Sequence, residues 1–229
     1  TLQKESSMNQ FTEDLHNVVA QILAGAEISD SEIFKELTIE PDFYKVQDQY
    51  YGGNGIYFNS ESETRFSLRS KSKGVLYLAT TAFTGLKEFY QDAPLVETED
   101  LEKNCMAVIQ AARTIKIIDL AALAPHLKTP LGYLMGSKAV YEDTQWLAEV
   151  LSHYADGIEY LSRHTGKTCI ALWSDTVDGN GMLKNISVTP LIQFSLNGQS
   201  TQAILKSKLG ILTVFTTGGR ANRAKQGGE

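Results

Sequence analysis

The sequence predicts a single mixed α+β domain, and three observations support this fold class. Short apolar runs typical of buried strands alternate with segments whose apolar residues recur about every three to four positions, as in amphipathic helices. The alternation does not follow the strict strand–helix–strand order of parallel α/β folds. No internal repeat, low-complexity linker or boundary divides the 229 residues, so we expect one domain.

The composition is that of a folded protein that functions in water. Hydrophobic residues make up 42% of the chain and charged residues 21%, which excludes a disordered chain. The net charge of −6 argues against a protein that coats nucleic acid. Two cysteines cannot build a disulfide framework, and no apolar run approaches the roughly 18 residues of a membrane span. We therefore expect a soluble protein in a reducing compartment, with neither nucleic acid nor membrane as partner.

Helices are predicted from apolar periodicity and capping residues. Ser29 and Glu32 form a capping-box pattern, and Thr81 or Thr84 can cap a helix that ends before Pro94. We expect helices over residues 9–23, 29–37, 81–93 and 141–154.

Strands are predicted where compact apolar runs are bounded by glycine or polar residues. We expect strands over residues 43–46, 75–79, 114–120, 158–161 and 169–173, a glycine-rich loop over 50–55 and a turn over 178–181. The predicted division of the chain is a helical extension packed on the core (1–40), a main domain (41–217) and a flexible tail (218–229).

Three short motifs do not support a function. Gly166-Lys167-Thr168 matches the end of a phosphate-binding P-loop, but position 161 is Leu where that loop requires glycine. Residues 175–181 match a calcium loop poorly and are better explained as a hairpin turn. Ser162 with His164 lacks a third group to orient a nucleophile and its base. We therefore expect turns at these places and no bound metal.

Five residues with characteristic order and spacing remain, and they carry a family resemblance. They are Lys45, Arg65, Tyr77, Glu88 and Ser162. These residues and the segments around them resemble the RES-domain family of bacterial toxins. The matching segments are Tyr44-Lys45-Val46, Arg65-Phe66, Gly74-Val75-Leu76-Tyr77-Leu78-Ala79, the helix from Tyr141, Asp156-Gly157-Ile158, Leu161-Ser162-Arg163-His164 and the strand Cys169–Trp173. The resemblance covers about residues 43–175, so the domain at 41–217 is expected to be RES-like.

The resemblance implies a fold similar to that of ADP-ribosyltransferase toxins and an activity that degrades NAD⁺. The enzyme would cleave the bond between nicotinamide and ribose, with water or phosphate as acceptor. NAD⁺ would be its substrate, and no other cofactor is expected. The family also implies a cognate antitoxin or immunity protein, and a cytoplasmic site of action. Two alternatives are transfer of ADP-ribose to a protein target and a non-catalytic module that binds NAD⁺ or a partner. A freestanding toxin and an effector delivered into a target cell both remain open.

The chemistry of NAD⁺ cleavage gives each of the five residues an expected role. Arg65 would bind phosphate oxygens bidentately, and Lys45 would add a second cation. Glu88 would stabilise the oxocarbenium character that develops on the ribose. Tyr77 would offer a flat face and an orienting hydroxyl, and Ser162 would donate a hydrogen bond to the ribose or a phosphate. The family usually has Arg at the position of Lys45, so the bidentate geometry is lost there.

Each of these residues also has an ordinary structural interpretation. Arg65 and Glu88 could be solvated surface charges, Tyr77 could be a core residue, and Ser162 could simply belong to a turn. Arg163 and Arg69 are the next candidates for binding an anionic substrate.

Overall fold

The structure is a computed structural model, and it describes residues 17–21, 32–51, 54–91, 93–127 and 129–215. In these ranges the strands are β1 (Phe34–Leu37), β2 (Phe43–Asp48), β3 (Gly74–Ala79), β4 (Leu95–Glu97), β5 (Asn104–Ala111), β6 (Ile115–Asp119), β7 (Gly157–Leu161), β8 (Thr168–Ser174), β9 (Leu183–Pro190), β10 (Ser195–Leu196), β11 (Gln199–Ser200) and β12 (Leu212–Val214).

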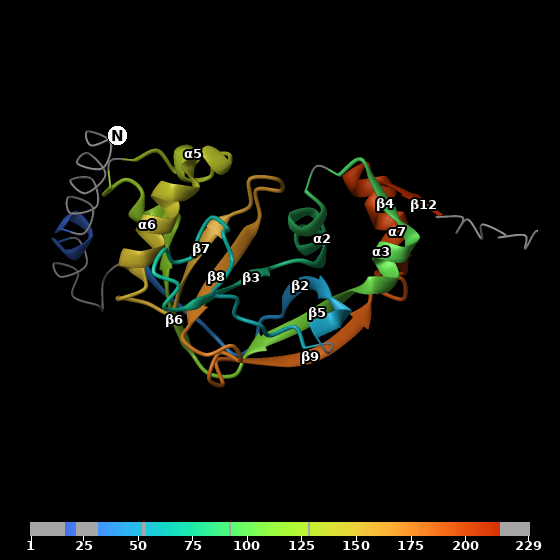
Figure 1. Cartoon of the computed structure of the whole chain (residues 1–229), viewed down its shortest axis with the longest axis horizontal. Coiled ribbons are helices and arrows are strands. Elements are labelled where there is room, and N and C mark those ends of the chain that lie inside the picture. Colours follow the sequence, from blue (N-terminus) through green and yellow to red (C-terminus); the bar gives the residue numbers. More distant parts are fainter. Residues whose placement is uncertain (1–16, 22–31, 52–53, 92, 128, 216–229) are drawn as a thin grey trace, which may run out of the picture.

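The helices are mostly short and lie between the strands. They are α2 (Ala82–Tyr90), α3 (Thr98–Lys103), α4 (Leu120–Leu123), α5 (Leu131–Leu134), α6 (Tyr141–Leu151) and α7 (Thr201–Ile204), with single turns η1 (Gln49–Tyr51) and η2 (Lys138–Val140) and a π-helical segment η3 (Leu205–Leu209). Residues 17–21 are also helical. Figure 1 shows α5 and α6 toward one end of the molecule, α3 and α7 at the other, and α2 between them.

One mixed sheet of eight strands, in the order β1-β6-β7-β8-β3-β2-β5-β9, organises the fold. Only β6 and β7 are parallel neighbours within it; the other neighbouring pairs are antiparallel. β2 and β3 pair at one position, Tyr44 with Ala79, and then β2 continues along β5 while β3 continues along β8. The sheet therefore opens between β2 and β3.

Alternating side chains of the sheet supply separate hydrophobic clusters. Val75 and Ala79 of β3 belong to the cluster that includes the buried residues of α6, whereas Leu76 and Leu78 belong to a cluster on the opposite face of the sheet. A third cluster forms beneath α2, α3 and α7 and includes Val46 of β2.

The structure confirms most of the predicted elements. The five predicted strands correspond to β2, β3, β6, β7 and β8, and the helices predicted over 81–93 and 141–154 correspond to α2 and α6. The turn over 178–181 forms with positive φ at Gly179, Asn180 and Gly181. Residues 17–21 agree with the first predicted helix, whose remaining residues lie outside the described ranges, as do those of the predicted tail.

The helix predicted over 29–37 is wrong in its described part. Phe34–Leu37 forms β1, which pairs antiparallel with β6 along Ile115–Ile118. Leu37 is buried against the sheet face opposite α6. The local capping pattern was outweighed by a tertiary pairing, since an apolar edge of β6 was available to receive a strand.

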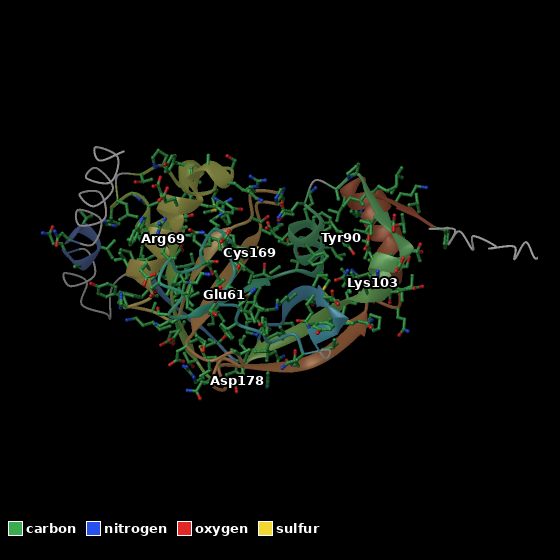
Figure 2. All side chains as sticks on the ribbon, in the orientation of Figure 1. Glu61, Arg69, Tyr90, Lys103, Cys169 and Asp178 are labelled. Atoms are coloured by element: carbon green, nitrogen blue, oxygen red, sulfur yellow. The ribbon has the colours of Figure 1, made fainter. Side chains whose placement is uncertain are left out.

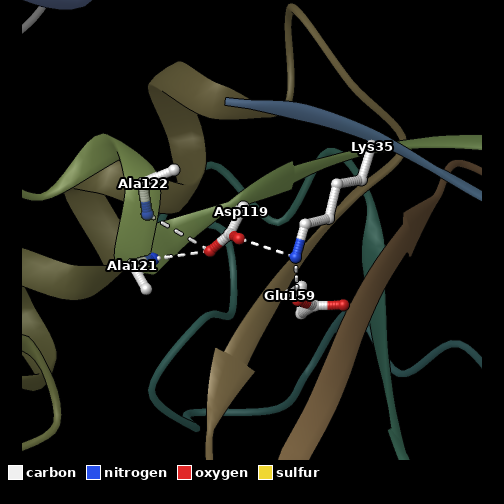
Figure 3. Close-up of polar contacts among 5 residues, drawn as sticks. All are labelled: Lys35, Asp119, Ala121, Ala122 and Glu159. Atoms are coloured by element: carbon white, nitrogen blue, oxygen red, sulfur yellow. Dashed lines mark hydrogen bonds and ion pairs between the residues drawn. The ribbon is translucent and has the colours of Figure 1, made fainter. Parts of the chain in front are cut away.

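A cluster of charges fixes β1 at the sheet edge (Figure 3). Lys35 Nζ lies 2.7 Å from Asp119 Oδ2 and 2.5 Å from Glu159 Oε1. The other oxygen of Asp119 accepts hydrogen bonds from the backbone N–H groups of Ala121 and Ala122. Asp119 therefore caps α4 while it binds Lys35, and Lys35 links β1 to both β6 and β7.

Candidate active site

A cavity of about 340 Å³ lies beside the opening between β2 and β3. Its size falls within the range of roughly 300–1,000 Å³ that is usual for small-molecule sites. It is bounded by β2, β3, β7, β8 and α2, together with the segments that precede β3 and α6. Figure 2 shows Cys169, a residue of its wall, on the sheet between α6 and α2. Of the five predicted site residues, the lining includes Lys45, Arg65, Tyr77 and Glu88.

Arg65 is buried at one side of this cavity, where protein groups hold its guanidinium. Its two terminal nitrogens donate to the backbone carbonyls of Leu134 and Gly136, at 2.7 and 2.6 Å. The guanidinium carbon lies 4.9 Å from the centre of the Tyr141 ring, in a cation–π contact. Among the described residues no carboxylate pairs with Arg65, so its positive charge remains uncompensated beside the cavity.

Distant elements hold the segment that carries Arg65. The Thr144 hydroxyl of α6 donates to the carbonyl of Arg65 at 2.8 Å, and Trp173 Nε1 of β8 donates to that of Phe66 at 2.8 Å. The hydroxyl of Tyr77 accepts from the Phe66 N–H at 2.9 Å. These contacts satisfy the backbone of a non-helical, non-sheet segment, which explains how it can be buried without regular structure.

Tyr77 therefore has two functions in the geometry of the site. Its ring lines the cavity and meets the Tyr160 ring edge to face, with centroids 6.4 Å apart. Its hydroxyl, 2.9 Å from Thr64 Oγ1, is occupied with the segment that carries Arg65. Burial raises the pKa of the Tyr77 hydroxyl far above its usual value, so the group stays neutral.

Glu88 extends from the last turn of α2, and its position is set by Ser162. The Ser162 hydroxyl donates to Glu88 Oε1 and accepts hydrogen bonds from the N–H groups of His164 and Thr165, at 3.2 and 3.1 Å. Ser162 is 2% exposed, so its hydroxyl is enclosed by the turn between β7 and β8. The structure thus places Ser162 behind Glu88, within contact of the carboxylate.

Lys45 reaches the cavity from a different direction. Its neighbours Tyr44 and Val46 pack into the cluster beneath α2, so Lys45 shares the opposite face of β2 with Phe43. Lys45 Nζ donates to the carbonyl of Gly55 at 3.3 Å. Burial without a carboxylate partner lowers the pKa of Lys45 to about 8.

Several cavity residues were missed by sequence reasoning. Tyr141 and Tyr160 belong to elements that were predicted correctly, but nothing in the local pattern indicates that their rings face a cavity. Thr64, Gly85, Phe89, Gln91, Met135 and Cys169 also line the cavity. Aromatic or apolar residues in strands and helices are usually core residues, and only the tertiary arrangement distinguishes a cavity wall from a core.

The arrangement combines a half-buried carboxylate, flat aromatic walls and uncompensated positive charge. Within the described residues, no group of three or more His, Cys, Asp or Glu side chains is placed to hold a metal ion. No helix in the described chain is long and apolar enough to cross a membrane. The carboxylate can stabilise a developing cation, and the guanidinium groups can attract an anion. The site is therefore suited to a substrate that carries both charges.

Comparison with known proteins identifies the family. The family model described as RES domain matches residues 44–191. A solved structure, the MbcT-MbcA toxin-antitoxin complex of M. tuberculosis, contains a chain similar to this one, with a TM-score of 0.53 and 12% identity over 67% of this chain and 85% of that chain. A comparison with curated proteins gives no significant match. The shared fold confirms the mixed α+β prediction, and the family match spans most of the chain: this protein belongs to the RES-domain family.

Proposed function

We propose that this protein is a toxin enzyme that degrades NAD⁺ by cleaving the bond between nicotinamide and ribose. The observation that supports this most strongly is the Glu88–Ser162 pair beside a cavity that also contains uncompensated Arg65. NAD⁺ carries a cationic nicotinamide–ribose linkage and an anionic diphosphate, which match the carboxylate and the guanidinium. NAD⁺ is the substrate in this proposal, and the chain's own residues supply the chemistry.

Glu88 is the proposed catalytic residue. When the C–N bond to the ribose breaks, nicotinamide leaves as a neutral base with the bonding electron pair, and C1′ of the ribose acquires oxocarbenium character. A carboxylate next to C1′ stabilises that charge in the transition state more than in the ground state, and this difference lowers the barrier. An oxygen of water or phosphate then bonds to C1′, and when water is the acceptor its proton is released to the solvent. A neutral leaving group needs no strong general acid, which agrees with a site built around a single carboxylate.

Ser162 is the proposed positioning residue for Glu88. Its hydroxyl hydrogen is directed to Glu88, and its oxygen accepts from two backbone N–H groups. A donor fixed in this way holds the carboxylate in one orientation without reorganisation during the reaction. Tyr77 and Tyr160 provide aromatic surface against which a nicotinamide ring could stack.

The proposed partner is a cognate antitoxin. The structurally similar chain from M. tuberculosis was solved as part of a toxin-antitoxin complex. The inference for this protein rests on that likeness in fold and on membership of the RES-domain family. Co-purification of the chain with the product of the adjacent gene, followed by inhibition of its activity, is the expected result if this partner exists.

The decisive assay is release of nicotinamide from NAD⁺ by the purified protein. We expect Glu88→Gln to reduce the rate roughly 100-fold or more, as for loss of an electrostatic catalytic group. Gln retains an oxygen that can accept from Ser162, so the fold should persist. Glu40→Gln is the matched control, because Glu40 is exposed and lies outside the cavity wall.

The outcomes of this assay separate the alternatives. The assay is repeated with NAD⁺ that carries a label in its ADP-ribose part. Release of nicotinamide while the label stays on a macromolecule would indicate transfer of ADP-ribose to a protein. Binding of NAD⁺ without release would indicate a non-catalytic module. Equal rates for Glu88→Gln and the wild type would remove Glu88 from the mechanism.

A further inference from the structure

The cations that line the cavity are not equally available to a ligand. Arg65 presents both terminal nitrogens to protein carbonyls, those of Leu134 and Gly136. These two nitrogens form the end of the guanidinium fork, which is one of the surfaces that binds phosphate oxygens bidentately. Arg65 can still contribute its charge, but this end of its fork is occupied.

Lys45 is also poorly placed for a phosphate that extends from a ribose near Glu88. Its side chain lies on the face of β2 opposite Tyr44 and Val46, and its ammonium is 3.3 Å from the Gly55 carbonyl oxygen. Val46 packs in the same cluster as Leu86 of α2, the helix that carries Glu88. Lys45 therefore approaches the cavity from the face of β2 that is turned away from α2.

Arg163 is different, because it lines the cavity and is exposed. It follows Ser162 directly in the turn between β7 and β8, next to the serine that contacts Glu88. Its Nε donates to His164 Nε2 at 3.2 Å. This contact leaves the two terminal nitrogens of Arg163 without a partner among the described residues, and no described carboxylate forms an ion pair with it.

The Arg163–His164 contact gives the guanidinium a defined direction. His164 also lines the cavity, and its backbone N–H donates to Ser162 Oγ. The turn is closed by backbone hydrogen bonds between Ser162 and Lys167 and between Gly166 and Ser162, each 2.8 Å long. Thr165 Oγ1 lies 3.2 Å from Thr84 Oγ1 of α2, so the turn is attached to the helix that carries Glu88. Arg163 thus extends from a part of the chain that is fixed relative to the catalytic carboxylate.

We propose that Arg163 binds the diphosphate of the dinucleotide substrate through its terminal nitrogens. This inference rests on the proposed function and assigns the phosphate contact to a residue other than Arg65. A diphosphate is joined to C5′ of the ribose whose C1′ reacts, so its binding group must stand at a short, fixed distance from the catalytic carboxylate. Among the cavity cations of the described chain, Arg163 combines that position with an open fork.

The first test compares variants that differ in charge at this turn. We expect Arg163→Gln to raise KM for NAD⁺ by roughly 10-fold or more, the loss typical of a charge-assisted hydrogen bond, with kcat changed less than about 2-fold. The KM of Arg163→Lys should lie between the values for Arg163→Gln and the wild type. Lys167→Gln is the control: it removes a positive charge from the same turn, from an exposed residue outside the cavity wall, and should leave KM unchanged.

The second test does not depend on catalysis. In phosphate-free buffer, ADP should raise the melting temperature of the wild type and of Lys167→Gln more than adenosine does, and Arg163→Gln should lose this difference. If the wild type releases no nicotinamide, the proposed function fails, while the ADP result still supports or rejects the diphosphate site. If the wild type is active and Arg163→Gln retains both its KM and its response to ADP, Arg163 is only a solvated surface cation and this inference is wrong.

Discussion

At the scale of single residues, Glu88 and Ser162 form the contact on which the proposed chemistry depends. The Ser162 hydroxyl serves three groups at once, the Glu88 carboxylate and two backbone N–H donors. Removing it leaves buried donors without an acceptor and leaves the carboxylate free to rotate. In the proposed mechanism, such a change lowers both the stability and the catalytic rate, which distinguishes a positioning residue from one that only contacts substrate.

We therefore expect Ser162→Ala to lower the free energy of unfolding by about 1–3 kcal/mol, the cost of leaving buried polar groups unsatisfied. It should also lower kcat by roughly 10-fold or more, because the orientation of Glu88 is lost. Urea denaturation and the nicotinamide-release assay measure the two effects. Ser162→Thr retains the hydroxyl and should recover part of kcat. An alanine variant that is fully active would show that Glu88 needs no such support.

Lys45 provides a test of electrostatics at the level of one side chain. Burial lowers its pKa in the folded protein from the usual value near 10.5 to about 8. Below pH 8 the lysine is protonated in both states, and the cost of burying its charge is present in full. Between about pH 8 and pH 10.5 the unfolded chain holds a proton that the folded protein has released, so the free energy of unfolding rises with pH.

Comparison with Lys45→Met isolates this effect from other groups that titrate in the same range. We expect the wild type to gain about 1–3 kcal/mol relative to the variant between pH 7.5 and pH 10. Urea denaturation at several pH values measures the difference. If the free energy of unfolding changes with pH equally in the two proteins, the Lys45 ammonium is hydrated in solution and its pKa is not lowered.

At the scale of elements, α2 places Glu88 because its first turn is fixed. The side chain of Thr81 accepts from the Thr84 N–H at 3.1 Å, and Leu86 of the same helix is fully buried. Thr84 in turn contacts Thr165 of the turn that holds Ser162. The start of α2, the proposed catalytic carboxylate of Glu88 and the hydroxyl of Ser162 are therefore joined by a continuous series of contacts.

We expect Thr81→Ala to lower the free energy of unfolding by about 1 kcal/mol, the usual cost of removing an N-cap. Thr81→Ser keeps the accepting oxygen and should restore most of this loss. The comparison is made by urea denaturation of the three proteins. If the alanine and serine variants are equally destabilised, packing of the threonine methyl group, and not the cap, stabilises the start of α2.

At the scale of the whole molecule, the interior strand β5, which is mostly buried, is not predicted. The sequence predicts β2, β3, β6, β7 and β8 and the helices α2 and α6, whose apolar patterns are local. It does not reveal β9, whose residues Leu183–Pro190 are largely exposed and end in proline, a pattern typical of loops. Nor does it reveal that Phe34–Leu37 joins the sheet edge, since that depends on a partner strand distant in sequence.

The candidate site is likewise predictable where local residues define it and unpredictable where tertiary packing does. The order and spacing of its residues indicate the family from the sequence alone, and the structure places Arg65, Tyr77 and Glu88 around one cavity. The opening between β2 and β3, the protein contacts of Arg65 and the direction of Lys45 could not be predicted from the pattern. All three depend on how elements distant in sequence pack against one another, and the spacing of residues in the sequence carries no information about that packing.

We propose that the whole fold assembles one catalytic carboxylate for NAD⁺ cleavage. The most direct measurement is the rate of nicotinamide release by the wild type, Glu88→Gln and Glu40→Gln under the same conditions. The proposal predicts rapid release by the wild type and Glu40→Gln and a rate roughly 100-fold lower for Glu88→Gln. No release by the folded wild-type protein, or undiminished release by folded Glu88→Gln, would contradict it.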